Sequence, residues 1–264
     1  MNIVVLLAGI VDPKWPLQGL HLGSDGVVAG DDKLPRKLSP FDEAALETAL
    51  KLRDADPEVH ITAFLLGGPQ SEQLLRAVAA FRLNRVYQVD YRPAYRWDVV
   101  QLARALKAAL DATEVRPELL LIGREFGDCD DGALPPYLAE VWGWRFVGLA
   151  QEVEHKDGEL KLLRGRGDVD EWLTLAPPAI ASVTNDKSNR LRHPLLKNVM
   201  AAKRETFAVI AAPDPGASPR LSPSSVKLSD TTLRRGAACR ILGGPVESQV
   251  AELAGFLQPW RGVP

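Results

Sequence analysis

Residues 119–123, Leu-Leu-Leu-Ile-Gly, place the strongest constraint on what this chain can fold into. An unbroken apolar run that ends at a glycine is typical of a strand buried on both faces of a parallel sheet. The next residues, 124–134, form an acidic loop with two glycines, and Pro135 and Pro136 open a helix-like segment. In an open parallel α/β sheet, ligands bind outside the carboxyl ends of the strands and against a helix N-terminus. This edge is therefore the candidate site.

The composition excludes several classes of protein. The 264 residues include 32 Lys and Arg against 34 Asp and Glu, so no basic surplus points to nucleic acid as a partner. The two cysteines lack a paired or metal-binding spacing, and we expect no disulfide framework and no metal site. No apolar run approaches the roughly 20 residues of a membrane span, and the N-terminus lacks the features of a signal peptide. The sequence predicts a cytoplasmic chain without membrane insertion.

Strand and helix patterns alternate along the first half of the chain. The expected strands are short and apolar, and the expected helices carry apolar residues at helical spacing. Such alternation predicts an α/β fold with a doubly wound, mostly parallel sheet of the Rossmann-like, nucleotide-binding kind. Strands are expected at residues 3–7, 59–66, 85–89 and 119–122, and helices at 40–53, 70–82, 95–110 and 135–142.

The pattern changes after residue 142. Four strand-like runs follow, at 146–154, 159–164, 171–175 and 179–184, and they predict an antiparallel extension of the sheet. Beyond residue 210 the composition shifts to Pro, Ala and Ser, as in linkers, and an amphipathic helix follows at 246–257. We therefore predict a nucleotide-binding-like α/β domain over 1–210 and a C-terminal linker and arm over 211–264. The terminal helix either docks on a partner chain or folds back on its own domain.

Motifs of a self-contained enzyme are absent from the sequence. His21, His60, His155 and His193 stand far apart, without acid or nucleophile partners at a known spacing. No nucleophile elbow, phosphate-binding P-loop or G-x-G-x-x-G fingerprint occurs. We therefore predict no catalytic residue and no metal ligand in this chain.

Ligand binding has better support, because small residues stand at three of the expected strand ends. These are Ala8 with Gly9, Gly67 with Gly68, and Gly123. A missing side chain lets a flat ring or a phosphate approach the backbone. The alternative is that glycine only terminates the strands.

Five segments of the chain, in order and spacing, resemble the beta subunit of electron transfer flavoproteins, the family that includes the FixA proteins. The similarity runs over most of the chain, and the shared order is more specific than any one segment. The segments are Ser39-Pro40-Phe41-Asp42-Glu43; Gly68-Pro69 with Glu72, Leu75 and Arg76; Leu121-Ile122-Gly123 with Asp128 and Asp130; residues 195–203; and residues 240–243 with Val250 and Leu253.

The resemblance implies a heterodimer in which an alpha subunit holds most of an FAD and this beta-type chain shapes one side of the site. Electrons then pass between a dehydrogenase and an acceptor through the flavin. The resemblance places Phe41 near the dimethylbenzene edge of the flavin and makes Leu196 the partner-docking leucine; for both, an ordinary core residue is the alternative. The cofactor residues that it implies are Leu6, Ala8, Ser39, Phe41, Gly67, Gly68, Gly123, Asp130, Asp131, Gly132, Ala133 and Leu134.

The sequence departs from the family pattern in the nucleotide loop. The resemblance implies a bound AMP, or a second FAD as in bifurcating relatives, but residues 131–135 lack the hydroxyl and amide side chains that hold its phosphate. Pro135 and Pro136 donate no N–H, and the aspartates repel a phosphate. The residues of this loop therefore do not support the nucleotide that the resemblance implies. A stand-alone adenine-nucleotide-binding or structural α/β protein without redox function is the alternative reading of the chain.

Overall fold

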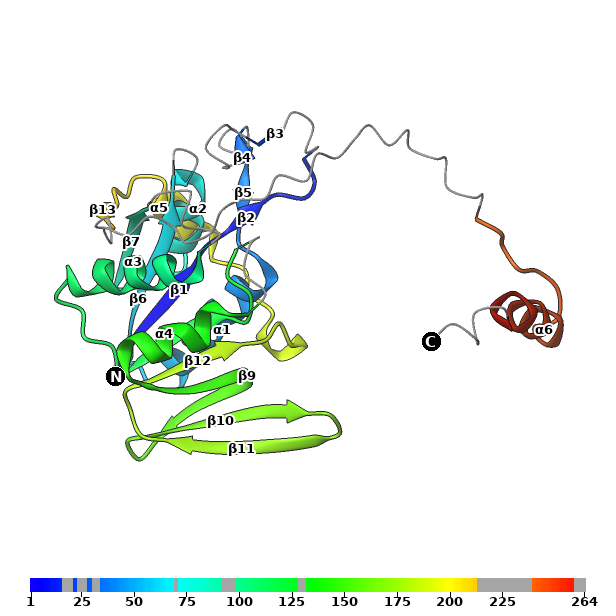
Figure 1. The fold of residues 1–264 in the computed structure, drawn as a ribbon. Coiled ribbons are helices and arrows are strands. Elements are labelled where there is room, and N and C mark those ends of the chain that lie inside the picture. Colours follow the sequence, from blue (N-terminus) through cyan, green and yellow to red (C-terminus); the bar gives the residue numbers. More distant parts are fainter. Residues whose placement is uncertain are drawn as a thin grey trace. The chain divides into compact units, whose positions relative to one another are not determined.

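Strand β1 (Asn2–Leu7) lies near the middle of the sheet that organises the first part of the protein (Figure 1). The computed structural model describes residues 1–15, 21–22, 28–29, 34–68, 71–91, 98–127, 132–212 and 239–258. Within them the main sheet has nine strands, in the order β11-β10-β9-β12-β8-β1-β6-β7-β13. The chain divides into the units Met1–Pro223 and Ser224–Pro264. The boundary expected at residue 210 remains a prediction.

The α/β alternation expected from the sequence is confirmed. Strand β1 pairs in parallel with β6 on one side and with β8 on the other, and β6 pairs in parallel with β7. The doubly wound, mostly parallel sheet is therefore confirmed as well. The elements are α1 (Pro40–Ala55), β6 (His60–Gly67), α2 (Glu72–Ala79), β7 (Arg85–Asp90), α3 (Val99–Asp111), β8 (Leu119–Gly123) and α4 (Leu134–Trp142).

Both faces of the central strands are covered, and this explains their unbroken apolar runs. In β1, Val5 packs in the core beneath α1 and α2, whereas Val4 and Leu6 pack in the core beneath α3 and α4. Neighbouring residues of a strand point to opposite faces, so a strand with two covered faces needs consecutive apolar residues. Figure 1 shows α3 and α4 crossing in front of the strands.

The antiparallel extension is formed by β10 (Glu159–Arg166) and β11 (Val169–Leu175). Strand β10 pairs antiparallel with β11 and with β9 (Arg145–Lys156). The fourth expected run does not join this extension. It forms β12 (Ala179–Val183), which returns between β8 and β9 and runs parallel to both. All five residues of β12 are buried, as in the other central strands.

Several short elements are not evident from the sequence pattern. Helix α5 (Leu196–Ala202) and strand β13 (Ala208–Ala211) follow β12, and β13 pairs in parallel with β7 at the edge of the sheet. A one-turn helix, η2, covers Lys187–Asn189. Two short antiparallel pairs of strands lie between β1 and α1 in the described part of this segment. The pairs are β2 (Ile10–Val11) with β5 (Arg36–Lys37), and β3 (His21–Leu22) with β4 (Val28–Ala29).

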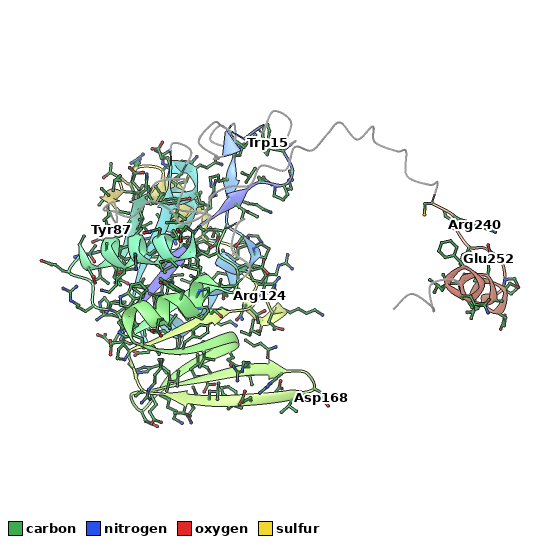
Figure 2. The ribbon with its side chains drawn as sticks, in the orientation of Figure 1. Trp15, Tyr87, Arg124, Asp168, Arg240 and Glu252 are labelled. Atoms are coloured by element: carbon green, nitrogen blue, oxygen red, sulfur yellow. The ribbon has the colours of Figure 1, made fainter. Side chains whose placement is uncertain are left out.

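The second unit contains helix α6, at Val246–Leu257, with the bounds that the sequence predicts. No residue of α6 is buried, and the apolar side chains Val246, Val250, Leu253, Phe256 and Leu257 are all exposed. Arg240 forms an ion pair with Glu252 of the helix (Figure 2). Among the described residues, no helix has both the length and the apolar character needed to cross a membrane.

Candidate functional site

The candidate site lies where the order of the strands reverses, at the carboxyl ends of β1 and β8. After β1 the chain builds β6 and β7 on one side, and it then returns to build β8 on the other side of β1 (Figure 1). The connections that leave β1 and β8 lead to opposite faces of the sheet, because α1 packs on one face and α4 on the other. In open α/β sheets the crevice between two such connections is where ligands bind. Ala8 and Gly9 follow β1, and Arg124 follows the last residue of β8, Gly123.

The N-terminus of α1 is fixed beside this crevice by a capping box. The hydroxyl of Ser39 accepts a hydrogen bond from the backbone N–H of Asp42 at 2.9 Å, and the Asp42 carboxylate accepts one from the N–H of Ser39 at 3.0 Å. Pro40 occupies the first turn, where its missing N–H costs nothing. Helix α1 thus begins at Pro40, as the sequence predicts, and a capping box fixes its first turn.

The carboxylate of Asp42 also ties α1 to the end of β1. One of its oxygens accepts the N–H of Ala8 at 3.1 Å, and the other accepts the N–H of Gly9 at 3.0 Å. The side chain is fully buried. Burial raises the pKa of Asp42, while the hydrogen bonds from Ser39, Ala8 and Gly9 act to lower it. Three backbone donors from two separate segments thus converge on one side chain.

Phe41 stands at the crevice because Gly123 leaves room for the first turn of α1. A Cβ on Gly123 would lie 2.6 Å from Cβ and 2.8 Å from the carbonyl carbon of Phe41. The Phe41 side chain remains partly exposed, whereas Ala45 and Ala49 of the same stripe are fully buried. Phe41 is therefore less buried than Ala45 and Ala49, and its place beside a flavin remains a prediction.

The guanidinium of Arg124 stacks over the ring of Phe41. Its central carbon lies 4.7 Å from the ring centroid, a distance typical of cation–π contacts. Arg124 also forms an ion pair with Glu125, and its side chain remains 42 % exposed (Figure 2). Together Phe41 and Arg124 offer a flat aromatic surface with a positive charge against it. The sequence alone does not predict this contact between Arg124 and Phe41. The one feature that could have indicated it is the position of Arg124 directly after the strand-end glycine Gly123.

The predicted glycines of the site have different structural roles. A Cβ on Gly67 would lie 2.2 Å from Cγ of Gln88, so this glycine makes room for a side chain of the neighbouring strand. Gly123 makes room for Phe41, as described above. A Cβ on Gly68 would meet no atom within 4 Å, and the N–H of Gly68 donates to the hydroxyl of Ser71 at 2.6 Å. Only at Gly68, among these three, does the missing side chain leave open space.

The remaining predicted cofactor residues lie at two places along this edge. Leu6 and Ala8 are buried at the end of β1. Gly132 has a positive φ of 101°, Ala133 precedes α4, and the side chain of Leu134 is fully buried in the core under α3 and α4. Asp130 and Asp131 lie outside the described residues. Within the described residues, no group of three or more His, Cys, Asp and Glu side chains could hold a metal ion.

The described residues suit a flat ring better than a phosphate. The partly exposed Phe41 ring and the Arg124 guanidinium fit an aromatic cofactor with negative charge on its reduced form. By contrast, the N–H groups of Ala8 and Gly9 already bind Asp42, and that of Gly68 binds Ser71. Helix α4 carries Pro135 and Pro136 in its first turn, which removes two N–H donors from its N-terminus.

Leu196, the predicted partner-docking residue, is the first residue of α5 and is 77 % exposed. The alternative that Leu196 is an ordinary buried residue is therefore wrong. Leu195 and Met200 are also exposed, and these three residues are referred to below as the apolar patch. Its role in docking remains a prediction.

Comparisons with known proteins point to one family. A family model described as the electron transfer flavoprotein domain matches residues 27–215. The electron transfer flavoprotein subunit beta of Bradyrhizobium diazoefficiens is 26 % identical over 263 residues, which span the whole of both chains. The proteins of the same name from Mycobacterium tuberculosis and Dictyostelium discoideum are 28 % and 26 % identical, over 81 % and 79 % of this chain and 80 % of each relative. These matches do not favour the stand-alone alternative. The chain therefore belongs to the electron transfer flavoprotein beta subunit family.

Proposed function

We propose that this beta-type chain shapes one side of an FAD site that an alpha subunit mainly holds. Electrons then pass between a dehydrogenase and an acceptor, and FAD supplies the redox chemistry when it is bound. The observation that carries the proposal is the partly exposed ring of Phe41 at the reversal of strand order, held by the capping box of α1. A cytoplasmic location is part of the same proposal.

The contribution of this chain is position and electrostatics, not catalysis by a side chain. The ring of Phe41 would cover apolar cofactor surface and keep water away from it. The guanidinium of Arg124 would favour negative charge added to a neighbouring ring. In the isolated chain the guanidinium of Arg124 is partly exposed to water and paired with Glu125. Both the solvent and this pairing weaken the electric field that it exerts on a neighbouring ring. Burial under an alpha subunit would strengthen it.

We propose no second nucleotide in this subunit. A phosphate at the strand ends would have to compete with the Asp42 carboxylate for the N–H groups of Ala8 and Gly9. The first turn of α4 offers fewer donors than an ordinary helix, since it contains Pro135 and Pro136. The described residues therefore do not fit AMP or a second FAD.

A Phe41→Ala variant tests the flavin site. The chain is co-expressed with the alpha-type protein encoded beside it, and the purified complex is examined for flavin absorbance. We expect a yellow heterodimer from the wild-type chain, and from Phe41→Ala a heterodimer with a shifted flavin spectrum and brighter flavin fluorescence, because water reaches the exposed ring. Phe41→Leu, which keeps an apolar side chain there, should show a smaller change. A wild-type chain that stays monomeric and colourless with every alpha-type neighbour would refute the proposal.

Helix α6 is the second surface that we assign to the alpha subunit. Val250 and Leu253 lie on its apolar stripe and are exposed, and an apolar stripe without cover is typical of a partner-binding helix. We expect the double variant Val250→Glu/Leu253→Glu to lower the yield of co-purified heterodimer at least tenfold. The double variant Ser248→Glu/Ala251→Glu adds the same charge to the same helix outside the stripe and should co-purify normally. Equal yields from both variants would contradict the docking role of α6.

A further inference from the structure

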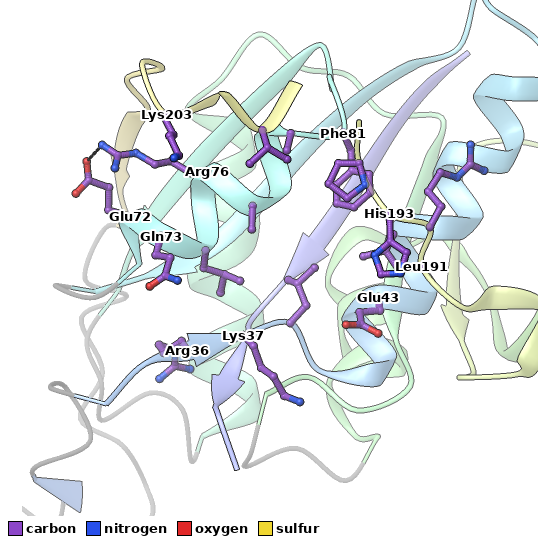
Figure 3. A pocket seen from close by; sticks show the side chains of 17 residues that line it. Arg36, Lys37, Glu43, Glu72, Gln73, Arg76, Phe81, Leu191, His193 and Lys203 are labelled. Carbon is purple, nitrogen blue, oxygen red and sulfur yellow. Dashed lines mark hydrogen bonds and ion pairs between the residues drawn. The ribbon is translucent and has the colours of Figure 1, made fainter. Parts of the chain in front are cut away.

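An open groove of about 910 Å³ lies between helix α2 and the segment that leads into α5 (Figure 3). Apolar side chains from both sides line it: Leu74 and Ala77 come from α2, and Leu191, Pro194 and Val199 come from the later segment. The volume is at the upper end of the range for sites that bind small molecules, and the groove is open along one side. Such a shape suits a segment of polypeptide.

Positive charge surrounds the apolar lining. The basic residues of the groove are Arg36, Lys37, Arg76, Arg192, His193 and Lys203, and the acidic residues are Glu43 and Glu72. Arg76 is neutralised by Glu72, at 2.6 Å on the same helix. Arg192 is neutralised by Glu47 and Asp54. Arg36, Lys37 and Lys203 then remain beside one further acid, Glu43, which leaves a net positive charge in the groove.

Lys37 and Lys203 have no ion-pair partner in the part of the chain that the structure describes, and they come from elements far apart in the sequence. Arg36 donates to the carbonyl oxygen of Gly9 at 3.0 Å and keeps its charge. Glu43 is the remaining acid; burial raises its pKa, and Lys37 acts to lower it. Figure 3 shows Lys37 and Lys203 at opposite ends of the groove. A lysine thus stands at each end of the apolar lining.

One wall of this basic groove is held rigidly against α1. The backbone N–H of Arg192 donates to Glu47 at 3.1 Å, and its guanidinium donates to Glu47 at 2.7 Å and to Asp54 at 2.6 Å. Glu47 is buried in α1. A few residues later the same segment presents the apolar patch around Leu196. A rigid wall lowers the entropy cost of binding. Leu196 and Met200 of the patch lie on α5, the helix that also contributes Val199 to the groove.

We propose that the basic groove binds an acidic, amphipathic segment of the electron-transfer partner. Apolar side chains of that segment would cover the lining contributed by α2, and its carboxylates would lie beside Lys37 and Lys203. The identity of the partner rests on the function proposed above, whereas the chemistry of the segment rests on the groove itself. Complementary charge of this kind mainly speeds association and makes binding depend on salt.

The test uses the full chain and a fluorescent synthetic helix with a leucine stripe and glutamates on its other face. We expect binding that weakens as salt is added, and no binding of the same peptide with lysines in place of the glutamates. The double variant Lys37→Glu/Lys203→Glu should bind the acidic peptide about tenfold or more weakly. Arg104→Glu/Arg145→Glu makes the same change in charge at exposed sites, one of them on α3 across the sheet, and should leave the affinity unchanged.

A second pair of variants tests the apolar lining. Ala77 is exposed on α2 within the groove, so the large side chain of Ala77→Trp should fill the groove without disturbing the core. Ala77→Ser is the control, because its small side chain leaves the groove open. Loss of peptide binding only in Ala77→Trp supports the groove, with unchanged thermal unfolding as the check on folding. Equal binding of the acidic and basic peptides, equal loss in both charge variants, or full binding by Ala77→Trp would each overturn the proposal.

Measuring peptide binding and heterodimer formation separately distinguishes a failure of this proposal from a failure of the proposed function. Peptide binding needs no flavin, so a chain that binds the acidic peptide but forms no flavin-bearing heterodimer would refute the proposed function alone. A working heterodimer without peptide binding would refute the groove alone. In that heterodimer, Leu196→Ala should slow reduction by the dehydrogenase and leave the flavin spectrum unchanged. An unchanged rate of reduction would mean that Leu196 does not contribute to docking of the dehydrogenase.

Discussion

Replacement of Asp42 by alanine is expected to lower the free energy of unfolding by about 3–5 kcal/mol, because it leaves three buried backbone N–H groups without an acceptor. The donors are Ala8, Gly9 and Ser39, at 3.1, 3.0 and 3.0 Å from the carboxylate. Each unsatisfied buried donor costs about 1–3 kcal/mol, and partial relaxation of the loop after β1 reduces the sum. The loss of the capping box adds to the effect.

Urea unfolding followed by circular dichroism measures this loss, provided that the slope with urea stays unchanged. Asp42→Asn keeps the size of the side chain but turns an N–H₂ toward some of the same donors, so we expect an intermediate loss. Asp111→Ala is the matched control: its carboxylate makes an exposed pair with Lys107, worth roughly 0.3–0.5 kcal/mol. A loss at Asp42 no larger than at Asp111 would mean that this carboxylate does not join α1 to β1.

The second large effect is expected at Gly123, where alanine should lower the free energy of unfolding by about 1–3 kcal/mol through overpacking. The added Cβ would lie 2.6 Å from Cβ and 3.0 Å from the carbonyl oxygen of Phe41. Part of this contact is backbone, which cannot rotate away, so the first turn of α1 must move. Because Phe41 moves with it, the same variant should also shift the flavin spectrum of the heterodimer.

Gly68→Ala is the control for the strand-end glycines. No atom lies within 4 Å of its added Cβ, so we expect stability within about 0.5 kcal/mol of the wild-type chain. The two variants are compared by urea unfolding, and then by flavin content after co-purification with the alpha-type partner. If Gly123→Ala is as stable as Gly68→Ala, the close approach of α1 to the end of β8 is not a constraint on the fold.

Local patterns predict most of the first unit. The capping box at Ser39 and the helix after it depend on residues within one turn, and the apolar runs of β1 and β8 reflect cover on both faces. The position of β12 is different. Its five buried residues identify a central strand, but nothing in them states that β8 and β9 are its neighbours. Helix α5 and strand β13 are too short to show a clear period.

The same distinction applies to the site. Sequence identifies Phe41 through a local motif, but the stacking of Arg124 over it depends on how closely α1 approaches β8. A glycine kept for a ligand looks the same in sequence as one kept for a neighbouring side chain. Gly67 makes room for Gln88 and Gly123 for Phe41, and in both cases the partner lies far away along the chain.

The late pairing of β1 has a consequence for biosynthesis. One edge of β1 pairs with β8, from Ile3 opposite Leu119 onward, so during synthesis this edge of β1 must wait until more than a hundred further residues have been made. Until then its amide edge and both apolar faces are open to aggregation, and parallel pairing of this kind is slow. The strands of the main sheet that the structure describes all end by Ala211. The first unit can therefore fold while the C-terminal unit is still being translated.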